Sequence, residues 1–171
     1  SVLGFTLHGA NFLTLKTAGS VHDKAKRWVN GLWVPTLLAA ILVIVSSYTF
    51  SGVIKGFGLN AGLLLLGGIL VLILQRVMMG RGREGWTFAL STLGVILFSA
   101  AIFVQLFPNV LVSSTNPQFN LTIYNAASGS YTLGVMSTVA LILVPLVLIY
   151  QGWSYWVFRK RISPADKNLQ Y

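Results

Sequence analysis

Residue types that could do chemistry are few in this chain, and they lie far apart in the sequence. It has three acids (Asp23, Glu84 and Asp166), two histidines (His8 and His22) and no cysteine. Without cysteine, disulfides, thiol catalysis, iron–sulfur clusters and cysteine zinc sites are excluded within this chain. The sequence also has no glycine-rich phosphate loop and no nucleophile–base pair. We therefore predict no catalytic residue and no metal site here.

His8 is the one ionisable residue well inside an apolar stretch. Ionisable residues within a membrane mark ion or proton paths by default. A haem needs axial ligands that converge on one iron, and the helix rise puts His8 and Met136 at depths too different to share it. Buried polar groups are normally hydrogen-bonded inside the protein. We interpret His8 as a packing residue, with a polar path or a contact with another subunit as its functional alternative.

The elements that carry these groups are long apolar runs. Of the 171 residues, 55% are hydrophobic and 9% charged, and the mean hydropathy is +0.76. A soluble domain of this size could not bury so much apolar surface. We predict an all-α integral membrane protein, a bundle of about five transmembrane helices of which the first is truncated. The expected helices are a partial one at 1–17 and complete ones at 28–48, 57–77, 85–107 and 131–158.

Basic residues gather at alternate connections between the predicted helices. One set of connections carries only Lys55, and the other carries the remaining eleven Lys and Arg. These are Lys16, Lys24, Lys26, Arg27, Arg76, Arg81, Arg83, Arg159, Lys160, Arg161 and Lys167. Since Lys and Arg are retained in the cytoplasm, we predict a cytoplasmic tail at 159–171 and an extracytoplasmic loop at 108–130. The net charge of +9 then reflects topology, so membrane lipid is an expected partner and nucleic acid is not.

The five tryptophans lie near the predicted cytoplasmic boundary. They are Trp28, Trp33, Trp86, Trp153 and Trp156. Amphipathic rings prefer the membrane–water interface. We interpret these side chains as interfacial anchors.

Both ends of the chain resemble a known family. Residues 8–17 read HGANFLTLKT, residues 107–109 read FPN, residues 121–126 read LTIYNA and residues 150–161 read YQGWSYWVFRKR. These segments, in this order, resemble subunit II of the cytochrome bd quinol oxidases. The middle helices are generic and add little to the resemblance.

The resemblance implies that the chain is the C-terminal half of a haem-free subunit II. In that family the complex oxidises quinol, reduces dioxygen to water and forms a proton gradient, and haem b, haem d and the quinol-oxidation loop belong to subunit I. The implied partners are subunit I, the N-terminal half of the same subunit and a small accessory subunit. The implied location is the prokaryotic cytoplasmic (inner) membrane. No catalytic or cofactor-binding residue is carried onto this chain.

The alternative function is that of a secondary transporter or channel fragment. Transporters place broken helices near the middle of the bilayer. Pro145 lies in the middle of the last predicted span, and we otherwise expect the spans to run without such an interruption. Haem in a complex purified through this chain would separate the two functions.

Overall fold

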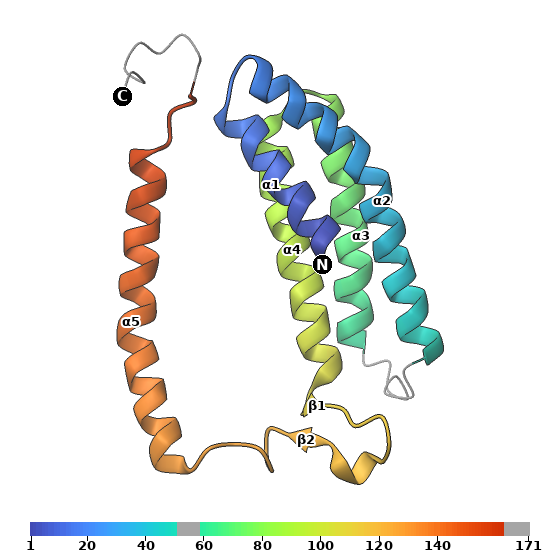
Figure 1. Cartoon of the computed structure of the whole chain (residues 1–171), viewed down its shortest axis with the longest axis vertical. Coiled ribbons are helices and arrows are strands. Elements are labelled where there is room, and N and C mark those ends of the chain that lie inside the picture. Colours follow the sequence, from blue (N-terminus) through green and yellow to red (C-terminus); the bar gives the residue numbers. More distant parts are fainter. Residues whose placement is uncertain (51–58, 163–171) are drawn as a thin grey trace. The chain divides into compact units, whose positions relative to one another are not determined.

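The chain is mostly helical in the computed structural model, which describes residues 1–50 and 59–162 (Figure 1). The helices are α1 (Val2–Lys16), α2 (Ser20–Phe50), α3 (Leu59–Gly80), α4 (Glu84–Leu106) and α5 (Ser130–Val157). In the described part of the chain, all but α1 contain a stretch long and apolar enough to cross a membrane. The expectation of an all-α membrane protein is confirmed. The start of the span expected at 57–77, the tail beyond 162, and Lys55, Asp166 and Lys167 lie outside the described residues.

The chain divides into two compact units. The first is Ser1–Gln105 together with the segment that starts at Arg161, and the second is Leu106–Lys160. In the first unit α1, α2, α3 and α4 run side by side as a bundle (Figure 1). With 15 residues, α1 is the shortest of the four helices.

The basic connection expected between the first two spans is largely helical. Helix α2 begins at Ser20, ahead of the expected span start at 28, so Lys24, Lys26 and Arg27 lie on its first turns. Residues 17–19 alone separate α1 from α2. Gly19 has a φ of 70°, a backbone conformation that glycine adopts without steric cost. Asp23 lies in the first turn of α2, where a negative charge suits the helix dipole.

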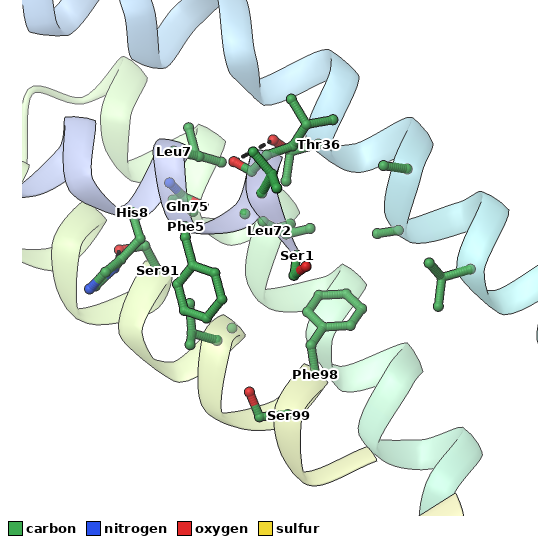
Figure 2. A pocket seen from close by; sticks show the side chains of 18 of the residues that line it. Ser1, Phe5, Leu7, His8, Thr36, Leu72, Gln75, Ser91, Phe98 and Ser99 are labelled. Atoms are coloured by element: carbon green, nitrogen blue, oxygen red, sulfur yellow. Dashed lines mark hydrogen bonds between the residues drawn. The ribbon is translucent and has the colours of Figure 1, made fainter. Parts of the chain in front are cut away.

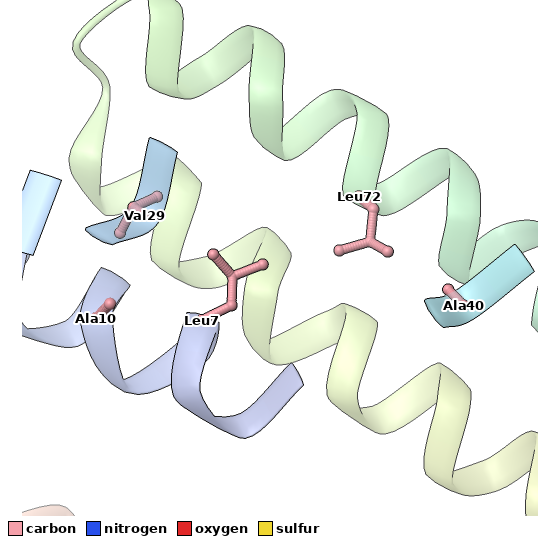
Figure 3. Close-up of a cluster of buried hydrophobic side chains, with 5 residues drawn as sticks. All are labelled: Leu7, Ala10, Val29, Ala40 and Leu72. Carbon is pink, nitrogen blue, oxygen red and sulfur yellow. The ribbon is translucent and has the colours of Figure 1, made fainter. Parts of the chain in front are cut away.

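A small core holds the first unit together (Figure 3). It consists of Leu7, Ala10, Val29, Ala40 and Leu72, and Trp33 and Phe98 are among the partly buried side chains packed against it. In lipid, helices associate by close packing and interhelical hydrogen bonds rather than by expelling apolar surface from water. These contacts between α1, α2 and α3 are therefore what specifies the bundle.

Glycines let α3 and α4 come close together. A Cβ atom at Gly68 would lie 2.9 Å from the Phe98 ring, whereas one at Gly67 would lie 3.7 Å from Leu97 Cδ1. On the opposite helix, a Cβ at Gly94 would lie 3.7 Å from Val71 Cγ1. Small residues at such positions permit the close approach on which membrane helix pairs depend.

The second unit contains the loop expected at 108–130 and helix α5. The loop has structure of its own: β1 (Asn109–Leu111) pairs antiparallel with β2 (Leu121–Thr122), and a 3₁₀ turn (Pro117–Phe119) lies between them. Two side-chain amides hold the loop, because Asn120 Oδ1 accepts from Ser113 N at 2.8 Å and Asn125 Oδ1 accepts from Thr122 N at 2.6 Å. Helix α5 is continuous through Pro145.

Candidate functional site

His8 makes a polar link between α1 and α4. Its Nδ1 lies 2.8 Å from Ser91 Oγ, and the Ser91 hydroxyl donates to the backbone oxygen of Phe88 at 2.8 Å. Since that hydroxyl proton is already used, Nδ1 is assigned as the donor to Ser91. The imidazole also stacks on the Phe88 ring, with 5.0 Å between the centroids. The half-buried His8 is thus packed and hydrogen-bonded, as expected for a polar group inside a membrane protein.

A cavity of about 450 Å³ lies beside this contact (Figure 2). Its lining is mostly apolar, and the polar residues along it include His8, Thr36, Gln75, Ser91 and Ser99. Pockets of this size with a few polar groups in an apolar wall are typical of sites for small molecules. The cavity could therefore accept a molecule with an apolar body and a polar group.

Two buried amides in the bundle lack a partner. Asn11 and Gln75 are each 1% exposed, and neither side-chain amide has a hydrogen-bond partner among the described residues. An unsatisfied buried polar group costs about 1–3 kcal/mol, so both positions demand an explanation. Sequence reasoning missed them because it searched the spans for ionisable residues. The signal was the spacing of Leu7, Asn11 and Thr14, which puts two polar residues on the buried face of α1.

A cluster of charged side chains lies at one end of the first unit. Glu84, on the first turn of α4, accepts a hydrogen bond from Arg161. Its other carboxylate oxygen lies 3.3 Å from His22 Nε2, while His22 Nδ1 donates to the Thr14 backbone oxygen at 3.0 Å. The sequence predicts only that Glu84 suits the helix dipole. The structure adds that it joins α2, α4 and the segment after α5.

A backbone bridge reinforces this cluster. Thr17 pairs in parallel with Ile162. Ala18 N donates to Ile162 O at 3.0 Å, and Ile162 N donates to Lys16 O at 2.9 Å. The segment after α5 is therefore tied to the connection between α1 and α2.

Replacing Glu84 with glutamine is expected to loosen this segment. The substitution leaves Arg161 and His22 without their anionic partner, but Arg161 is half-exposed, so solvent screening limits the loss to about 1 kcal/mol. Trypsin should then cleave after Lys160 and Arg161 several-fold faster in the purified protein. The matched control is Asp23→Asn, which removes an exposed acid from the same end. Equal cleavage rates for Glu84→Gln and Asp23→Asn would contradict the prediction.

The two histidines of the chain both have hydrogen-bond partners. Both nitrogens of His22 are engaged, with Thr14 and Glu84, and His8 uses Nδ1 for Ser91. No group of three or more His, Cys, Asp or Glu side chains within residues 1–50 and 59–162 is arranged to hold a metal ion.

Comparison with known proteins covers nearly the whole chain. The family described as cytochrome bd terminal oxidase subunit II matches residues 1–158. "Cytochrome bd ubiquinol oxidase subunit 2" of Bacillus subtilis is 36% identical over 160 residues, which are 93% of this chain and 47% of that protein.

Two further relatives agree. "Cytochrome bd-I ubiquinol oxidase subunit 2" of Escherichia coli K12 is 37% identical over 84 residues, 49% of this chain and 22% of that protein. "Probable cytochrome oxidase subunit 2" of Haemophilus influenzae is 26% identical over 194 residues, 94% of this chain and 50% of that protein. The chain spans about half the length of the relatives that it matches along most of its own length.

Proposed function

Because the chain belongs to the cytochrome bd terminal oxidase subunit II family, we propose that it acts as part of a quinol:oxygen oxidoreductase. In this proposal the complex oxidises quinol, reduces dioxygen to water and forms a proton gradient. The chain supplies the C-terminal half of a haem-free subunit II and supports a subunit I that bears haem b and haem d. The observation that carries the proposal is the 36% identity to the Bacillus subtilis ubiquinol oxidase subunit across 93% of the chain.

The proposed partners follow from the part of the subunit that is present. The chain corresponds to about half of its relatives, so the N-terminal half of the same subunit is one partner. Subunit I is the second, since these relatives are named as subunit 2 of an oxidase. A small accessory subunit completes the assembly. In this role the chain contributes packing surface and binds no haem itself.

We propose that the protein lies in the prokaryotic cytoplasmic membrane with its C-terminus in the cytoplasm. The sorting of basic residues supports this orientation. The cluster around Glu84 supports it independently, because it brings together three basic segments that the charge sorting assigns to one side. The contacts of this cluster join residues 16–27 and 161–162 with Glu84, which directly follows the basic segment at 76–83.

For His8 we propose a packing role between α1 and α4. The Ser91 bond and the Phe88 stacking support it. His8→Leu should cost about 1 kcal/mol of stability, Ser91→Ala should cost a similar amount, and the double variant should cost little more than either one. Quinol oxidase turnover per haem is expected to be unchanged in all three variants. A loss of turnover in His8→Leu at normal haem content would instead support a polar path through His8.

The proposed function is tested by the visible spectrum of the complex purified gently through this chain. Reduced b- and d-type haem bands are expected, and they should disappear from this chain when the partner subunit is stripped away. A fully assembled but colourless preparation would overturn the proposal. It would favour the alternative function, a secondary transporter or channel fragment. Transporters typically contain broken helices, but α2 and α5 are continuous through Pro35 and Pro145.

A further inference from the structure

Asn11 lines a second, much smaller cavity. This cavity has a volume of about 20 Å³, and Asn11, Thr14, Val29, Thr87 and Glu84 are among the residues that line it. A cavity needs roughly 10–15 Å³ of this kind of volume to hold one water molecule. The volume of this cavity therefore suits a single water-sized molecule. The larger cavity beside Gln75 has room for larger molecules as well.

The residues that line the cavity offer both hydrogen-bond donors and hydrogen-bond acceptors. The Thr14 hydroxyl donates to the Asn11 backbone oxygen at 2.8 Å, and the Thr87 hydroxyl donates to the Arg83 backbone oxygen at 3.0 Å. Each hydroxyl oxygen thus keeps lone pairs that can accept another bond. The Asn11 amide adds a donor and an acceptor, neither of which has a partner in the described part of the chain.

We propose that this cavity is a binding site for one ordered water molecule. Asn11 Nδ2 donates to the water oxygen, and the water donates to the hydroxyl oxygens of Thr14 and Thr87. This gives the water three polar partners, the usual number for a buried water. It also removes the cost of burying an unpartnered amide donor.

The charges around the cavity favour a neutral occupant. Lys26 and Glu84 both line it, so a cation would meet the ammonium and an anion would meet the carboxylate. Water experiences neither repulsion. Because Glu84 also binds Arg161, the proposed water lies next to the charged cluster at the end of the bundle.

Hydroxyl-radical footprinting by X-ray pulses tests the site, because radicals formed from a bound water modify the side chains around it. The intact membrane complex that contains this chain is used. Val29, which lines the cavity, is 1% exposed, and Val71, which lines neither cavity described above, is 7% exposed. Val29 should nevertheless be modified several-fold faster than Val71. Slower modification of Val29 than of Val71 would follow from exposure alone and would overturn the proposal.

Two variants and a matched control test whether the modification of Val29 comes from the proposed water or from nearby bulk solvent. Asn11→Leu removes the amide and fills the space, and Thr87→Val removes one acceptor at almost constant volume. Both should lower the modification rate of Val29 several-fold. Thr92→Val should leave it unchanged, since Thr92 makes the same type of bond on α4, to Phe88 O at 3.1 Å, and does not line the cavity. An unchanged Val29 rate in Asn11→Leu would overturn the proposal.

A second measurement keeps the test decisive if the variants fail to assemble. A cryo-electron microscopy map of the unaltered complex, at a resolution that shows ordered water, should contain a peak within hydrogen-bond distance of Asn11 Nδ2. A map that shows other buried waters but no peak there would overturn the proposal. Neither measurement depends on the proposed oxidase activity, so failure of one proposal leaves the other standing.

Discussion

Replacing Trp33 with alanine is expected to destabilise the first unit by about 3–5 kcal/mol, the usual cost of truncating a packed tryptophan. Trp33 packs against the core cluster, and its Nε1 donates to the Leu72 backbone oxygen at 3.0 Å. The Arg76 guanidinium also lies over the indole ring, 5.7 Å from its centroid. The substitution thus removes apolar packing, an interhelical hydrogen bond and a cation–π contact at once. Equilibrium unfolding of the purified protein in detergent measures the loss.

The matched control for Trp33 is Trp28→Ala on the same helix. Trp28 is 65% exposed, so its removal should change the free energy of unfolding far less. The more conservative Trp33→Phe variant keeps a ring in the core and loses the hydrogen bond, at an expected cost of about 1 kcal/mol. Equal destabilisation by Trp33→Ala and Trp28→Ala would show that the buried contacts of Trp33 add no stability beyond that given by an exposed tryptophan.

The second large effect is expected from Leu7→Ala, at about 2–5 kcal/mol of lost stability. Leu7 is 2% exposed and lies in the middle of the core cluster. Truncation would leave a cavity among the packed helices. The cost depends on how far Ala10, Val29 and Leu72 can collapse into that space.

The control for Leu7 is Leu13→Ala, also on α1. Leu13 is 46% exposed, and truncation there opens no internal cavity. Thermal unfolding should therefore shift strongly for Leu7→Ala and weakly for Leu13→Ala. A larger shift for Leu13 would contradict the packing described for α1 and would indicate that its outer face is buried by another chain.

The apolar runs predict the all-α membrane fold because each complete run is long enough for a helix to cross the bilayer. The span expected at 85–107 corresponds to α4 at Glu84–Leu106, and the partial helix expected at 1–17 corresponds to α1 at Val2–Lys16. The start of α4 is marked locally by Glu84 and by Gly82, which has a φ of 68°. Boundaries of this kind depend on neighbours in the chain, so sequence reasoning can address them.

Sequence reasoning says less where a residue's role depends on another helix. All five tryptophans look alike as interfacial anchors, yet Trp33 differs from Trp28 because the Leu72 carbonyl of α3 lies within reach. Asn11 and Gln75 carry no charge, so a search for ionisable residues passes over them, and their lack of partners among the described residues depends on what the facing helices present. The pairing of β1 with β2 depends on Asn120 and Asn125 bonding to backbone groups several residues away. The first contacts are set by tertiary packing and the last by the local course of the loop, and apolar periodicity reports neither.

The bridge between Thr17 and Ile162 has a consequence for how many times the chain can cross the bilayer. Two segments joined by backbone hydrogen bonds must lie on the same side of a membrane. The number of crossings between them is therefore even, which agrees with the four described helices, α2, α3, α4 and α5, that are long and apolar enough to cross a membrane. A sequence change that turned any one of these helices into a re-entrant or surface segment would make the number odd and carry Thr17 and Ile162 to opposite faces. While the bridge is kept, the chain can therefore lose one crossing only if it loses a second one as well.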